Sequence, residues 1–136
     1  MDETMVNMGR TRRRLAVVAL FSVLGAMGCT RGSLVAPDTA PEQTGIVVEI
    51  GQTIRARVNR PDQLLQVWVA NSVDDECGAI YIVTAETVIG VLDPEGGDPR
   101  AGTLADIRVG VDVQVWSGIV ELSCPGLGAA TWLLVR

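Results

Sequence analysis

Three cysteines carry the most distinctive chemistry in this sequence of 136 residues: Cys29, Cys77 and Cys124. A thiol can form a disulfide, bind a metal ion or accept a covalent group. A metal site is disfavoured, because the sequence contains no histidine, which is the commonest metal ligand. Two thiols can pair with each other, so the third needs an explanation of its own.

Acid–base catalysis has few candidate residues in this chain. Histidine and lysine are both absent, which excludes Ser–His and Cys–His constellations and a Schiff-base amine. A pair of carboxylates is the remaining option, drawn from Asp74, Asp75, Glu76, Asp93, Glu95 and Asp98. Such groups are mostly solvated loop charges, and the run "DPEGGDP" is not a recognised calcium loop. We therefore expect a protein that is not an enzyme and that uses no metal or other cofactor.

The residues before Cys29 are typical of an export signal. Four arginines between positions 10 and 14 precede the uncharged segment "LAVVALFSVLGAMG", residues 15–28. As a helix this segment would span about 21 Å, which is less than the roughly 30 Å hydrocarbon core of a bilayer. Ala26 and Gly28 provide small side chains at the positions that a signal peptidase recognises. Residues 1–28 are therefore predicted to be a signal peptide.

The run "AMGC", residues 26–29, resembles the end of a bacterial lipoprotein signal. Such signals end in Leu-(Ala/Ser)-(Gly/Ala)-Cys, so the resemblance implies that the Cys29 thiol receives a diacylglycerol before cleavage. Ala26 stands where leucine is usual, and Met27 where a smaller residue is usual. Two alternatives remain: a soluble secreted protein cut at the same bond, and an uncleaved membrane anchor. Thr30 is not the aspartate of inner-membrane retention signals, so by analogy the expected location is the outer membrane or periplasmic face of the envelope.

Assigning Cys29 to a lipid leaves Cys77 and Cys124 as a predicted disulfide. Disulfides form and persist in exported proteins, where the surroundings are oxidising. Closing the loop of about 48 residues would contribute on the order of 4 kcal/mol in the chain-entropy model. That contribution is a large part of the total stability of a small domain.

The chain after the signal divides into a spacer and a folded domain. Residues 29–44 contain two prolines among small and polar residues and show no apolar periodicity, so we expect a flexible tether. Residues 45–136 are expected to form one domain.

The charge of the exported part bears on its partners. From Cys29 onward the sequence has 7 Arg, no Lys and 14 acidic residues, a net charge of −7. An acidic protein repels the phosphate backbone, so nucleic acid is not an expected partner. The expected partners are the membrane, through the N-terminal lipid, and an envelope protein or a glycan.

Five segments are predicted to be strands: 46–58, 64–71, 78–92, 105–118 and 130–136. The pattern is clearest in 105–118, where apolar residues from Ile107 to Val115 alternate with mostly polar ones. Gly110 inside this segment suggests a bulge or a bend. Five strands in about 90 residues favour an all-β fold, a small five-stranded closed barrel, because closure removes exposed edges. A small sandwich is the alternative.

Three stretches resemble a family of small exported bacterial proteins of unknown function: "YIVTAETVI" (81–89), "ADIRVGVDVQVW" (105–116) and "IVELSCPGLGAA" (119–130). The matching positions are Thr87, Gly110, Val113, Val115, Trp116, Ser123, Pro125 and Ala129. Cys124 stands where that family usually has an aromatic residue, consistent with a disulfide particular to this branch. The resemblance covers about 50 residues and implies an OB-like barrel, but no established activity.

Trp116 and Trp68 mark the candidate binding face. Trp116 falls on the polar side of its predicted strand, opposite the valines, and OB barrels use exposed aromatic side chains to stack on bases or sugar rings. The alternative is that the tryptophans pack under loops or against a barrel edge. Together these observations predict a lipid-anchored envelope protein with a disulfide-stapled, non-catalytic binding or scaffolding barrel. The alternatives are a soluble secreted barrel that binds a small ligand and a carboxylate-based hydrolase.

Overall fold

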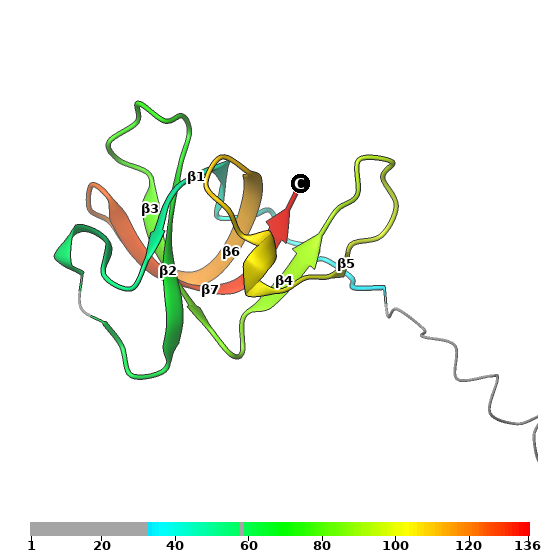
Figure 1. Ribbon diagram of the computed structural model, residues 1–136, viewed down its shortest axis with the longest axis horizontal. Coiled ribbons are helices and arrows are strands. Elements are labelled where there is room, and N and C mark those ends of the chain that lie inside the picture. The colour runs from blue at the N-terminus through cyan, green and yellow to red at the C-terminus, as the bar shows by residue number, and fades with distance from the viewer. Residues whose placement is uncertain (1–32, 58) are drawn as a thin grey trace, which may run out of the picture. The chain divides into compact units, whose positions relative to one another are not determined.

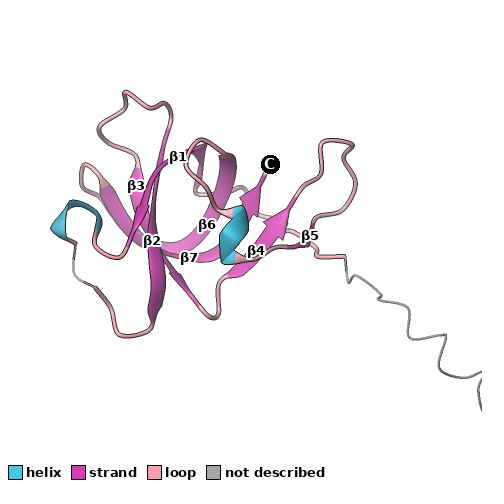
Figure 2. Cartoon of the chain, viewed as in Figure 1, coloured by secondary structure: helices cyan, strands magenta, loops and turns pink. Residues whose placement is uncertain are grey.

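The computed structural model describes residues 33–57 and 59–136, and these residues form an all-β domain (Figures 1 and 2). Five strands close into a barrel in the order β3-β2-β1-β6-β7, and β7 pairs back onto β3. They are β1 (Gln43–Gly51), β2 (Gln63–Ala70), β3 (Ala79–Thr84), β6 (Asp112–Glu121) and β7 (Gly126–Val135). The β3–β7 pair is parallel, whereas the other pairs in the barrel are antiparallel. This order is the OB arrangement, and it confirms the predicted closed barrel.

Two short strands extend the sheet beyond the barrel. β4 (Val88–Val91) runs parallel to the last residues of β7, and β5 (Arg100–Ala101) pairs with β4 at the edge of the sheet. The first residues of β7 pair with β3 instead. The β4–β5 hairpin and the barrel closure therefore lie at opposite ends of β7.

Alternation of side chains along the strands places the core inside the barrel. Every second residue faces inward, as the period of two predicts for a strand with one buried face. The fully buried inner residues include Val47, Val67, Val69, Tyr81, Val83, Val113, Val115 and Leu133. Val113 and Val115 lie on the inner face that the sequence pattern predicted.

The segment 105–118 is only partly a strand. Leu104–Asp106 form a short 3₁₀ turn, η2, closed by a hydrogen bond of 2.8 Å from the backbone N–H of Thr103 to the Asp106 carboxylate. Gly110 then adopts a φ of 92°, which favours glycine, and β6 begins only at Asp112. Val109, predicted to face inward, is consequently exposed. The alternation therefore predicted the strand correctly but placed its start too early.

The other predicted strands differ from the structure at their ends. Segment 78–92 is divided into β3 and β4 by a turn, in which the backbone N–H of Thr84 donates to the Thr87 hydroxyl oxygen at 3.0 Å. β1 begins at Gln43 and ends at Gly51, well before position 58, and β7 begins at Gly126 rather than at 130. Segment 64–71 matches β2 to within one residue at each end.

The predicted disulfide is confirmed. Cys77 and Cys124 are bonded, with their Cα atoms 4.6 Å apart. Cys77 lies near the end of the loop between β2 and β3, and Cys124 lies in the loop between β6 and β7. The bond therefore joins two loops at the end of the barrel where β7 begins.

Residues 33–42 differ from the flexible tether expected over 29–44. Ser33 forms a β-bridge with Arg100 of β5, and the backbone N–H of Leu34 donates to the Pro99 carbonyl at 2.9 Å. Further along, the carbonyl oxygen of Thr39 accepts a hydrogen bond of 2.8 Å from the Trp116 indole. We call residues 33–42 the N-terminal strap. The predicted signal peptide, Cys29 and residues 30–32 lie outside the described residues.

Candidate functional site

The candidate site is the outward side of β2, β3 and β7, which we call the outer face. Trp68 points outward because it alternates with Val67 and Val69 of the core. Ile80 and Leu127 lie beside Trp68 on the same face, and Ile54 from the β1–β2 loop packs over them. In OB barrels, this part of the sheet and the adjoining loops are the usual place for ligands.

The β1–β2 loop is fixed onto the outer face by three kinds of contact. Ile54 is 1% exposed, and its backbone N–H donates to the Gln66 side-chain oxygen at 2.9 Å. The Arg57 guanidinium donates to the Pro125 carbonyl at 2.8 Å and to the Ser123 hydroxyl at 3.3 Å. The loop thus bridges β2 and the disulfide-bonded β6–β7 loop.

Arg55 covers Trp68 from the solvent side. Its guanidinium carbon is 4.7 Å from the centre of the indole ring, within the range of a cation–π interaction. The indole N–H donates to the Cys77 carbonyl at 2.6 Å, so Trp68 is also tied to the β2–β3 hairpin. Arg55 and Ala56 have φ values of 52° and 56°, a conformation that costs a non-glycine residue on the order of 1 kcal/mol or more.

Two concavities flank this loop. One of about 400 Å³ is lined by Val48, Arg55, Trp68 and residues 73–76 of the β2–β3 hairpin, and its lining is mainly polar. The other, of about 520 Å³, has a mainly apolar lining: Arg60, Ile82, Gly118, Leu127, Gly128, Ala129 and Thr131. Both volumes lie within the range of small-ligand sites.

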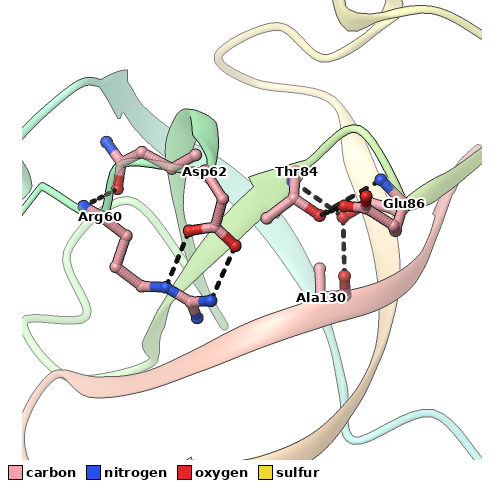
Figure 3. Close-up of polar contacts among 7 residues, drawn as sticks. Arg60, Asp62, Thr84, Glu86 and Ala130 are labelled. Atoms are coloured by element: carbon pink, nitrogen blue, oxygen red, sulfur yellow. Dashed lines mark hydrogen bonds and ion pairs between the residues drawn. The ribbon is translucent and has the colours of Figure 1, made fainter.

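Polar contacts involve residues at or next to the lining of the larger concavity (Figure 3). The Arg60 guanidinium is paired with the Asp62 carboxylate at 2.8 Å, which partly neutralises the charge at that rim. On β7, the Ala130 carbonyl accepts a hydrogen bond of 2.7 Å from the Thr87 hydroxyl. Thr87, one of the positions in the family pattern, therefore anchors the β3–β4 turn to β7.

The tryptophans are covered, contrary to the expectation of an exposed binding face at Trp116. Trp68, Trp116 and Trp132 are each at most 9% exposed. Trp116 does point out of the barrel, but it packs edge-to-face on Trp132 with ring centroids 5.9 Å apart. Leu34 and Ala36 of the N-terminal strap cover this pair. The alternative of packing under other segments is thus the one that the structure supports.

The carboxylates considered for catalysis lie on two separate loops. Asp74 and Glu76 are exposed, while the Asp75 carboxylate accepts hydrogen bonds from the backbone N–H groups of Asn71 and Cys77. In the β4–β5 loop, Asp93 pairs with Arg100 at 3.4 Å. Within residues 33–57 and 59–136, no group of three or more acidic or thiol side chains has the arrangement of a metal site.

Tyr81 is the buried titratable group of the barrel, and it makes a pH-dependent stability testable. Burial, with a smaller effect from the charge of Glu42, raises its pKa to about 12, from about 10 in an unfolded chain. The protonated phenol donates to the Gln43 side-chain oxygen at 2.9 Å. Below pH 10 the Tyr81 phenol is protonated in both the folded and the unfolded protein. As the pH rises above 10, this phenol ionises first in the unfolded protein. We therefore expect the free energy of unfolding to fall by roughly 2 kcal/mol between pH 10 and pH 12.

This titration has unusually little interference, because the sequence has one tyrosine and no lysine. Phenolate absorbance should show a midpoint near pH 12 in the folded protein, and Tyr81→Phe should remove that part of the pH dependence. A midpoint near pH 10 in the folded protein would contradict the burial of the phenol.

Comparisons with known proteins give no relative from which the role of this site can be inferred. The sequence matches no protein-family model, and no curated protein or solved structure matches it significantly. The OB-like barrel that the sequence resemblance implied is confirmed by the strand order. Among the described residues, no helix has the length and apolar character needed to span a bilayer.

Proposed function

We propose that this chain is a lipid-anchored protein of the bacterial cell envelope, related to the exported OB-like family, whose barrel is a non-catalytic scaffolding or binding module. The observation that carries the proposal is the Cys77–Cys124 disulfide. It indicates an oxidising, extracytoplasmic compartment and accounts for two of the three cysteines. Cys29 is the remaining thiol, and it directly follows the signal-like segment 15–28.

Scaffolding is favoured by the disulfide-bonded end of the barrel. Leu122 in the β6–β7 loop is 98% exposed, and Val73 in the β2–β3 hairpin is 72% exposed. The disulfide joins these two loops, so a covalent bond restrains the segments that carry the apolar tips. Contiguous exposed apolar patches mark protein-interaction sites, and we propose that these two tips act together in that way. A protein partner is favoured over a glycan, because the tryptophans that would stack on sugar rings are covered.

A small-ligand function is the second candidate. The concavity of about 520 Å³ beside Leu127 and Ile82 has the size and apolar lining of a ligand site. It would serve a soluble secreted form as well as an anchored one. A carboxylate-based hydrolase receives less support, since two facing carboxylates in a cleft would be needed and the acidic loops are largely exposed.

Incorporation of a labelled fatty acid tests the anchor. In cells that make the full chain, the wild-type protein should take up the label and Cys29→Ser should not. The double variant Cys77→Ala/Cys124→Ala is the matched control, because it removes the other thiols and should keep the label. An unlabelled wild-type protein, or a labelled Cys29→Ser variant, would exclude acylation at Cys29 and favour the soluble secreted form.

A further inference from the structure

The N-terminal strap determines how much chain separates the barrel from position 29. Ser33 already bridges Arg100, and the next residue, Leu34, is bonded to Pro99. Only residues 30–32 therefore lie between Cys29 and Ser33, the first residue whose contact with the barrel the structure describes. Fully extended, the chain from Cys29 to Ser33 reaches at most about 14 Å. A free tether over the whole of 29–44 would reach more than three times as far.

The attachment point is at one end of the barrel. Ser33 and Leu34 contact the β4–β5 hairpin, which is joined to the last residues of β7. The disulfide lies beside the first residues of β7, at the opposite end of that ten-residue strand. Ten residues of strand extend about 33 Å. In Figure 1 the strap meets β5 on the opposite side of the barrel from the β2–β3 hairpin.

We infer that the β4–β5 hairpin is the membrane-proximal end of the barrel and that the disulfide-bonded loops form the membrane-distal end. This inference rests on the proposed lipid at Cys29, which would place that residue at the level of the lipid headgroups. The distance of about 14 Å is less than half the length of β7, so the hairpin stays close to the bilayer surface, whereas the other end, about 33 Å along β7, is free to extend away from it.

Charge indicates that the tether, rather than attraction to lipid, imposes this orientation. The β4–β5 loop carries Asp93, Glu95 and Asp98 against Arg100, a net charge of −2, so anionic headgroups repel this loop and the tether has to keep it near them. The strap itself is held by burial: Leu34 packs on the Trp116–Trp132 pair, whereas Val35 next to it is exposed. The exposed tips at Val73 and Leu122 then face away from the membrane, where a protein partner can reach them.

Paramagnetic broadening in lipid nanodiscs tests this orientation directly. The barrel and the strap lie within the described residues 33–57 and 59–136, and the proposed cleavage leaves a chain that begins at Cys29, so that chain is used as the mature protein. With Cys77 and Cys124 bonded, the Cys29 thiol can be coupled to a maleimide phospholipid in neutral nanodiscs that contain a nitroxide-headgroup lipid. Amide signals of residues 93–101 should broaden several-fold more than those of residues 72–77 and 121–124. Equal broadening of both groups, or the reverse order, would overturn the inference.

Two strap variants provide a matched comparison. Leu34→Asp should release the strap, lengthen the tether and reduce the difference in broadening, while Val35→Asp should leave it unchanged. If both variants keep the full difference, the strap does not set the orientation. Because the lipid is attached chemically, this result is independent of acylation in the cell. A failure of fatty-acid labelling would therefore remove the proposed anchor without changing the orientation measured here.

Discussion

Replacing Cys77 and Cys124 together with alanine is expected to lower the free energy of unfolding by about 4 kcal/mol. The bond joins two loops that are 47 residues apart in sequence, so its loss frees a long segment of the unfolded chain. Urea denaturation of the variant and of the wild-type protein under non-reducing conditions measures the difference.

Reduction provides the control for this first prediction. A thiol reductant should destabilise the wild-type protein by a similar amount and leave the double variant unaffected. Cys29→Ser should change the stability by no more than about 0.5 kcal/mol, since Cys29 lies outside the disulfide. A loss below about 1 kcal/mol in the double variant would mean that the hydrophobic core holds the barrel without the covalent bond.

Ile54→Ala is expected to cost about 2 to 4 kcal/mol in the free energy of unfolding. Ile54 is 1% exposed and fills the space over Trp68 and Ile80, so its truncation leaves a cavity under the β1–β2 loop. Two backbone positions in this loop, Arg55 and Ala56, are in the left-handed region, and the burial of Ile54 is one of the contacts that offset that cost. Chemical denaturation gives the magnitude.

Hydrogen exchange separates local from global effects of Ile54→Ala. If the loop alone opens, the amide of residue 54, which donates to Gln66, should lose protection while the amides of β3 and β7 keep theirs. Leu64→Ala is the matched control, because Leu64 is exposed at the start of β2 and should cost no more than about 0.5 kcal/mol. A similar small cost for both substitutions would show that the loop is not held by Ile54.

The sequence was sufficient to predict the architecture, because the barrel interior follows from local alternation. Val113 and Val115 could be assigned to the core from their spacing alone, and the disulfide followed from counting cysteines. Strand ends were predicted less well. Gly110 and the Thr84–Thr87 turn interrupt apolar runs that look continuous in sequence, and it is hydrogen bonding and a positive φ that end those strands.

The surroundings of the tryptophans could not be read from the sequence. Trp116 lies on the outside of the barrel, as alternation predicts, but Leu34 covers it from more than 80 residues earlier in the chain. Trp68 is likewise covered by Ile54, a contact between residues separated by a loop without regular periodicity. Burial by such distant segments depends on the tertiary arrangement, which the local sequence pattern does not contain. The candidate binding surfaces are therefore the two concavities and the exposed loop tips, and not the tryptophan side chains.

The central claim is that Cys29 carries lipid while Cys77 and Cys124 are bonded to each other. Intact-mass spectrometry of the protein purified from membranes of cells that make it, before and after reduction, tests both parts at once. We predict a chain that begins at Cys29, carries the added mass of acyl chains on that residue and gains two hydrogen atoms on reduction. An unmodified Cys29, cleavage at another bond, or no gain on reduction would contradict the account.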